Sequence, residues 1–126
     1  MRIETRRGDR RPAWVYSVGT EPDPRFSLAN ERTLLAWIRT SLALAAGGLA
    51  LFFTDELFGD WSALLSAAAF SISIVVVVGA LGRWARMERA LRRGDGLPAP
   101  WLAATLVGAL VLGAVIGAIA VFILTP

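Results

Sequence analysis

Two long stretches without a charged side chain constrain this chain more than any other feature. Residues 62–82 and 101–124 contain no Asp, Glu, Lys or Arg over 21 and 24 residues. About 20 consecutive apolar residues are enough for a helix to cross the ~30 Å hydrocarbon core of a bilayer. Because 56% of the whole chain is hydrophobic as well, a membrane protein is the first expectation.

A third apolar stretch is shorter and carries charge at one end. Residues 40–54 are uncharged, but these 15 residues give only about 22 Å of helix. A spanning helix here must also include residues 34–38, and Arg39 comes with them. We therefore predict an all-α integral membrane protein with three transmembrane helices, at about residues 34–54, 62–82 and 101–124.

The helices are expected to extend beyond the membrane. Asp23 followed by Pro24 is a favourable helix start, with Asp as the N-cap and Pro in the first turn. Gly94, followed by Pro98 and Pro100, predicts a helix end after residue 93. We expect helical cytoplasmic extensions at about 24–33 and 83–93. Residues 23–126 would then form one three-helix domain, and residues 1–22 an Arg-rich flexible tail in the cytoplasm.

The charges predict an orientation. The loop between the first two spans contains acidic residues only, and the C-terminus is uncharged. Basic residues precede the first span. A second group of basic residues, the basic cluster, follows the second span and consists of Arg83, Arg86, Arg89, Arg92 and Arg93. Because basic loops stay in the cytoplasm, the N-terminus is expected to be cytoplasmic and the C-terminus outside.

One face of the first helix is both small and cationic. Arg25, Arg32 and Arg39 are spaced seven residues apart and fall on one side of a helix. Small side chains share that side: Ala29, Ala36, Ala43, Gly47 and Ala50. In one interpretation this face packs against another helix, and Arg39 reaches the headgroups. In the other, it lines a polar cavity where the arginines bind an anion.

Other residues suggest packing between helices. Asn30 and Glu31 lie off the Arg face, so we expect them to bond to a neighbouring helix or to the Arg cluster after the second span. In the third span, Gly113 and Gly117 form a GxxxG motif, a spacing that lets helices approach closely. We therefore expect a homo-oligomer in the lipid bilayer.

The stretch PRFSLANERTLLAWIRTSLALAAGGLAL resembles the signature of the YidH-like bacterial inner-membrane family, domain of unknown function 202. The resemblance covers residues about 22 to 124 and implies a multi-pass protein of the bacterial plasma (inner) membrane. This family is also similar to the membrane domain of the vacuolar transporter chaperone complex, a multi-subunit ring associated with polyphosphate synthesis and translocation. The resemblance makes Arg25 and Arg32 candidate polyphosphate-contacting residues.

Two functional hypotheses follow. The first is a non-enzymatic oligomer whose Arg-lined cytoplasmic mouth binds or conducts anions such as phosphate or polyphosphate. The second is a structural or anionic-lipid-binding membrane protein without transport activity, in which the cluster after the second span grips headgroups. We expect no enzyme, because no nucleophile–base pair or phosphate-binding glycine loop is evident. Without Cys or His, no metal site is expected. We also expect no cofactor and no nucleic-acid partner.

Overall fold

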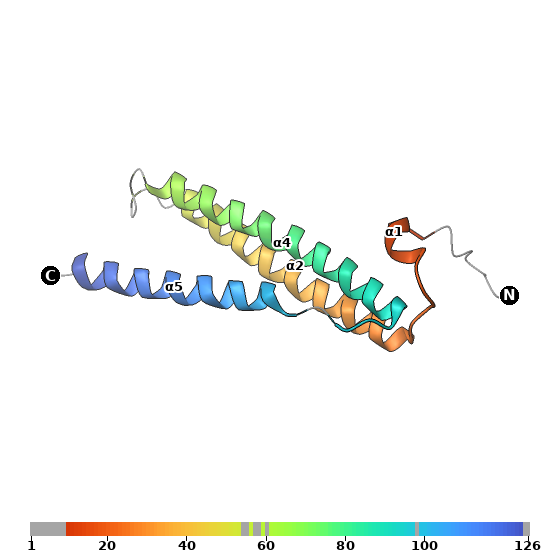
Figure 1. Cartoon of the computed structure of the whole chain (residues 1–126). Coiled ribbons are helices and arrows are strands. Elements are labelled where there is room, and N and C mark those ends of the chain that lie inside the picture. The colour runs from red at the N-terminus through yellow and green to blue at the C-terminus, as the bar shows by residue number, and fades with distance from the viewer. Residues whose placement is uncertain (1–9, 54–55, 57–58, 60, 98, 125–126) are drawn as a thin grey trace.

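The computed structural model describes residues 10–53, 56, 59, 61–97 and 99–124, and within them every regular element is helical (Figure 1). The helices are α1 (Ala13–Tyr16), α2 (Pro24–Phe52), α4 (Trp61–Arg93) and α5 (Trp101–Leu124). Helices α2 and α4 form an antiparallel hairpin. We call the end where α2 begins and α4 stops the arginine-rich end.

Local sequence accounts for two of the helix ends. The Asp23 side chain accepts a hydrogen bond from the backbone N–H of Arg25 (2.9 Å), with Pro24 in the first turn of α2. Helix α4 ends at Gly94, whose φ of +71° is a conformation that L side chains rarely adopt. The N–H of Asp95 then donates to the carbonyl of Ala90 (3.0 Å), which satisfies a carbonyl of the last turn. Both ends lie where the sequence predicts them.

The contact between α2 and α4 follows a regular spacing on α2. From Ser27 to Leu51, the less exposed positions recur alternately every three and four residues. This is the spacing of two helices that pack at a shallow angle. At Gly48 an added Cβ would lie only 3.1 Å from the Cβ of Ala69, so the missing side chain lets the two helices approach closely here.

The hairpin interface is polar at its centre. The Ser41 hydroxyl donates to the carbonyl of Ser73 (2.9 Å), and the Ser73 hydroxyl donates to the carbonyl of Ser41 (2.7 Å). Ser62 and Ser66 are also buried on α4. Small hydroxyl residues are favoured between helices in lipid, because they permit close approach and bond across the interface.

The outward surface of the hairpin is apolar. Leu42, Ile74 and Val78 are each more than 60% exposed. Helices α2 and α4 are both long and apolar enough to cross a membrane, and only 11% and 22% of their most apolar stretches are buried. A soluble core helix would be mostly buried, so this surface suits lipid. The acidic residues Asp55 and Asp60 of the predicted outer loop lie outside the described residues.

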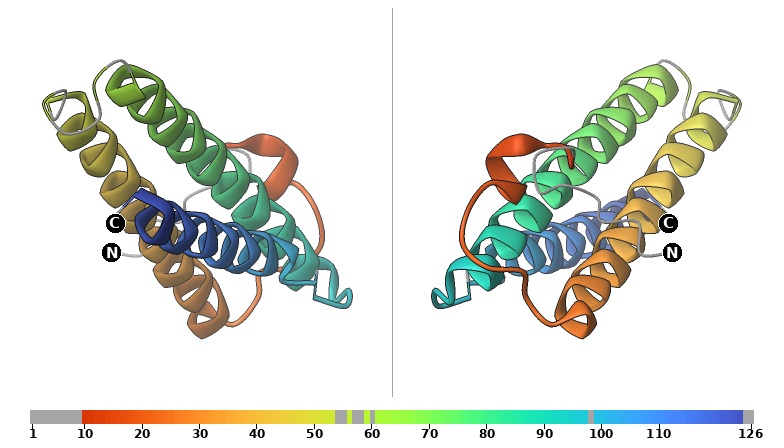
Figure 2. Two further views of the ribbon diagram at one scale, coloured as in Figure 1. Left: turned by 90° about the vertical axis from the view of Figure 1, so that its left-hand side faces the viewer. Right: turned by 90° about the vertical axis from the view of Figure 1, so that its right-hand side faces the viewer.

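Helix α5 stands apart from the hairpin (Figures 1 and 2). It starts part of the way along the hairpin from the arginine-rich end and runs toward the opposite end (Figure 1). Ala103–Gly113 is an apolar part of this helix. An added Cβ at Gly113 would meet nothing within 4 Å, so this glycine packs against no part of its own chain that the structure describes. The surroundings of Gly117 lie outside the described side chains.

Residues 10–22 differ from the flexible tail expected for residues 1–22. Helix α1 packs on the end of α4 (Figure 2), and Val15 is completely buried. The backbone N–H of Thr20 donates to the carbonyl of Arg92 (3.0 Å). Gly19 is needed beside it, because its φ is +63° and a Cβ there would collide with the Arg92 carbonyl. The buried Val15 and the close approach at Gly19 hold this segment against the end of α4.

Candidate functional site

The three arginines of α2 lie on the face that α4 leaves uncovered. Arg25, Arg32 and Arg39 are all exposed. The small residues predicted to accompany them are exposed too: Ala29, Ala36, Ala43, Gly47 and Ala50. Successive arginines are about 10 Å apart along the helix at ~1.5 Å per residue. They therefore form a row and do not converge on one small ligand within a single chain.

The pairing of the helices gives the depth of Arg39. Ser41 lies against Ser73, and in an antiparallel pair this places Arg39 level with about Val75. Val75 is seven residues, about 10 Å of helix, inside the nearer end of the uncharged stretch 62–82. Arg39 has no ion-pair partner among the described residues. The backbone of Arg39 thus lies about a third of the way into the apolar length of the hairpin.

The basic cluster at the end of α4 is divided by the structure. Arg86, Arg89 and Arg93 line a cavity of about 250 Å³ together with Asp95. The Arg86 guanidinium lies 5.9 Å from the centre of the Trp101 ring, and that of Arg89 lies 5.4 Å from the centre of the Trp14 ring. Such contacts attract a cation to an aromatic face. Two of the three arginines are thereby held against aromatic rings beside the cavity.

The other two members of the cluster lie elsewhere. Arg83 lines a separate hollow of about 190 Å³ with Asn30. Arg92 is buried, with its guanidinium 4.7 Å from the centre of the Tyr16 ring. Its Nε is 3.4 Å from Oε1 of Glu88, one turn earlier on α4. Arg92 therefore belongs to the packing between α1 and α4 and does not face an open cavity with the rest of the cluster.

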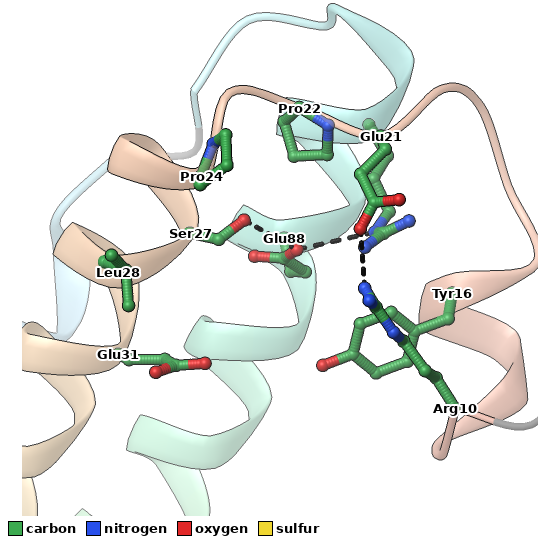
Figure 3. Close-up of a pocket in the computed structure, with 10 residues that line it drawn as sticks. Arg10, Tyr16, Glu21, Pro22, Pro24, Ser27, Leu28, Glu31 and Glu88 are labelled. Atoms are coloured by element: carbon green, nitrogen blue, oxygen red, sulfur yellow. Dashed lines mark hydrogen bonds and ion pairs between the residues drawn. The ribbon is translucent and has the colours of Figure 1, made fainter. Parts of the chain in front are cut away.

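Glu88 is a buried acid that is not among the residues predicted for the site. The Ser27 hydroxyl donates to its Oε1 (3.1 Å), so this carboxylate joins α2 to α4 (Figure 3). The same carboxylate also pairs with Arg92. A signal was present, because Glu88 is the one acid within the basic run 83–93 and lies four residues before Arg92. That spacing is typical of an ion pair within a helix.

The cavity around Glu88 has a mixed charge. It measures about 300 Å³, and Figure 3 shows residues from α1, α2 and α4 pointing into it. Three glutamates and two arginines line it: Glu21, Glu31, Glu88, Arg10 and Arg92. Arg10 and Glu21 form an ion pair of 2.6 Å. With acids in excess, this cavity does not favour an anion.

The polar residues of the NERT motif thus lie in different places. Asn30 is buried and its side-chain amide donates to the carbonyl of Trp84 on α4 (3.1 Å). Glu31 lines the mixed-charge cavity, and Arg32 points to the uncovered face. Within the part of the chain that the structure describes, no group of three acidic side chains could hold a metal ion.

Comparisons with known proteins agree with this membrane hairpin. The family described as "Domain of unknown function (DUF202)" matches residues 25–90, which cover nearly all of α2 and most of α4. Inner membrane protein YidH of Escherichia coli K12 is 39% identical over 89 residues, which are 67% of this chain and 75% of YidH.

Two further relatives are similar over comparable lengths. An uncharacterized protein of Mycobacterium tuberculosis H37Rv is 42% identical over 80 residues, 62% of this chain and 66% of the relative. Vacuolar transporter chaperone complex subunit 1 of Schizosaccharomyces pombe is 36% identical over 97 residues, 75% of each chain. No solved structure matches the chain significantly.

Proposed function

This chain belongs to the DUF202 family of membrane proteins, and from that membership we propose that it is a non-enzymatic inner-membrane protein that assembles with copies of itself and binds phosphate-bearing anions through the arginines of α2. Three membrane spans, a cytoplasmic N-terminus and an outer C-terminus are part of the proposal. The anion would meet the arginines at the cytoplasmic mouth of the assembly.

The position of Arg39 carries this proposal. An arginine at the centre of a membrane helix costs roughly 2.5–3.5 kcal/mol on insertion scales, and less toward the ends of the span. Arg39 is uncovered within one chain and lies level with the apolar stretch of α4. Lipid is a poor neighbour for it, whereas water or an anion between several copies of α2 would solvate the charge. The small residues Ala36 and Ala43 on the same face allow such copies to approach.

The names of two relatives support the location and the assembly. The Escherichia coli relative is named an inner membrane protein, and the Schizosaccharomyces pombe relative is named a subunit of a vacuolar transporter chaperone complex. A subunit of a complex needs a surface for its neighbours, and the uncovered arginine face of α2 could provide one. We extend both properties to this chain as proposals.

The chemistry of the side chains suits phosphate. A guanidinium group offers planar, bidentate hydrogen bonds to phosphate oxygens and stays charged at any physiological pH. Arg25, Arg32 and Arg39 repeat at about 10 Å along α2, so successive arginines can each contact a different phosphate of a long polyanion. Polyphosphate is therefore the ligand class that uses the whole row.

Thermal unfolding of the purified protein with short-chain polyphosphate tests this assignment. At low salt, where charge attraction is least screened, polyphosphate is expected to raise the unfolding temperature of the wild-type protein. Arg32→Gln should lose most of that rise, whereas Arg11→Gln, which replaces an exposed arginine outside α2, should keep it. An equal rise in Arg32→Gln would remove Arg32 from the site. No rise in any protein would contradict anion binding altogether.

A second candidate function rests on the cavity lined by Arg86, Arg89 and Arg93. These arginines lie just beyond the apolar stretch of α4, at the level of lipid headgroups. Each basic residue near an anionic membrane surface contributes about 1 kcal/mol of attraction. The protein would then be an anionic-lipid-binding membrane protein without transport. Anion flux from liposomes separates the two functions, because the second predicts none.

A further inference from the structure

An apolar cavity of about 330 Å³ separates α4 from α5. Ile72, Val75 and Val76 line it from α4, and Leu106 and Ala109 line it from α5. Two hydroxyl residues also border it, but both hydroxyls are bonded within their own helices. Ser71 donates to the Ala67 carbonyl (2.8 Å) and Thr105 to the Trp101 carbonyl (2.7 Å). The cavity therefore offers an occupant an apolar surface.

The cavity lies at membrane depth and ends next to the basic cavity. Its α4 wall belongs to the uncharged stretch 62–82. Trp101, at the start of α5, lines the apolar cavity and also contacts the Arg86 guanidinium, which lines the basic cavity. Tryptophan is enriched at the boundary between hydrocarbon and headgroups. Trp101 thus marks the junction between an apolar compartment and a cationic one.

The basic compartment carries excess positive charge. Arg86, Arg89 and Arg93 face it with one acid, Asp95. Contacts with Trp101 and Trp14 hold Arg86 and Arg89 beside the cavity before any ligand arrives. An arrangement that is already in place reduces the ordering cost of binding. The favoured occupant of this half is an anionic group, and guanidinium groups bind phosphate well.

We infer that α4 and α5 together seat one anionic phospholipid, with an acyl chain in the apolar cavity and the headgroup phosphate on Arg86, Arg89 and Arg93. This inference deepens the second candidate function. A free phosphate would use the cationic half alone, and a neutral lipid would use the apolar half alone. An anionic phospholipid fills both cavities, because its acyl chain suits the apolar cavity and its phosphate suits the basic cavity.

Native mass spectrometry of the protein with added phosphatidylglycerol or phosphatidylcholine tests whether the basic cavity binds an anionic headgroup. The wild-type protein should retain phosphatidylglycerol in preference to phosphatidylcholine. Each arginine removed should weaken retention roughly fivefold, the factor that corresponds to about 1 kcal/mol. The double variant Arg86→Gln/Arg93→Gln is thus expected to lose about twenty-five-fold, and Arg11→Gln, which lines neither cavity, to lose much less. Circular dichroism checks that each variant keeps its helices.

A cavity-filling variant tests whether the apolar cavity holds the acyl chain of the lipid. Val75→Phe places a larger side chain in the apolar cavity and should reduce phosphatidylglycerol retention at least fivefold. Val78→Phe is the control, because Val78 is also an exposed valine of α4 but is not among the residues that line this cavity. Stabilisation of the protein by inorganic phosphate, measured by thermal unfolding, should be the same in both phenylalanine variants.

The possible failures are distinguishable. Equal retention of the two lipids would contradict both the second candidate function and this inference. A preference for phosphatidylglycerol that survives Val75→Phe would leave headgroup binding intact. It would contradict the proposal that the same lipid places its acyl chain in the apolar cavity. A loss of oligomer in Val75→Phe, without any lipid retained by the wild-type protein, would instead assign the apolar cavity to a helix of a second copy.

Discussion

Single residues in this hairpin have roles set by their partners more than by their type. Arg92 and Arg93 are adjacent in the sequence, yet Arg92 is buried against Glu88 and Tyr16 while Arg93 lines an open cavity. Asn30 joins α2 to α4, and its neighbour Glu31 does not. A basic or polar motif therefore contains both structural and ligand-accessible positions.

The Glu88–Arg92 pair is expected to stabilise the arginine-rich end. Glu88→Ala leaves the Arg92 guanidinium buried without its carboxylate, and removing one partner of a buried pair costs about 3 kcal/mol or more. We therefore expect a clearly lower unfolding temperature in detergent. Glu31→Ala, which removes an exposed carboxylate nearby, should change it little.

A double replacement checks the cause of that loss. Glu88→Leu/Arg92→Met removes both charges and keeps apolar volume, so much of the stability should return. If Glu88→Ala is as stable as the wild-type protein, the pair has no structural role and Arg92 remains available to a ligand.

At the scale of elements, the sequence predicts helix ends better than helix contacts. The Asp23–Pro24 start and the Gly94 end are local signals, and both appear in the structure. The interface between α2 and α4 is less evident because Ser41, Ser73 and Gly48 are neither large nor strongly apolar. The Ala row on the opposite face is more conspicuous, although all of its members are exposed in the single chain.

The site was predictable to a similar extent. The row of Arg25, Arg32 and Arg39 follows from helical periodicity alone, and the structure places all three on one exposed face. The division of the basic cluster could not be foreseen, because it depends on Trp14 and Tyr16 folding back onto α4 from a segment distant in sequence. Only tertiary packing decides which arginines are covered.

Two adjacent glycines of α2 distinguish the two faces. Gly48 lies against Ala69 and Ser66, whereas an added Cβ at Gly47 would meet nothing within 4 Å. Gly48→Leu should therefore force α2 away from α4 and destabilise the hairpin by about 1–3 kcal/mol. Gly47→Leu should leave the unfolding of the single chain unchanged but weaken self-association, measured by native mass spectrometry. Equal effects of the two variants would contradict this assignment of faces.

At the scale of the whole molecule, charge is concentrated at one end. Arg10, Arg11 and the basic residues of α4 after position 82 all lie at the arginine-rich end, and the opposite end of the hairpin contains Glu56. The apolar surface lies between these ends, as expected for a protein oriented by its basic residues across a bilayer.

Reporter fusions test that orientation. A reporter enzyme that is active only outside the cytoplasm should be inactive when fused at residue 1 or at residue 96, and active when fused after residue 126. The reason is that translocating the basic segments is disfavoured, while the C-terminal stretch carries no charge. Activity at residue 1 would reverse the orientation and move the α2 arginines away from the cytoplasm.

The central claim is that the arginine face of α2 borders a polar space shared between copies. Because the chain has no cysteine, single cysteines can report what each face contacts, since a thiol reacts as the thiolate, which forms in water. The most direct measurement is the labelling of Ala36→Cys and Leu42→Cys in membranes by a charged, water-soluble thiol reagent. We predict that Ala36→Cys is labelled and forms disulfide-linked dimers on oxidation, while Leu42→Cys, on a lipid-facing surface, is not labelled. Labelling of Leu42→Cys with none at Ala36→Cys would contradict the claim.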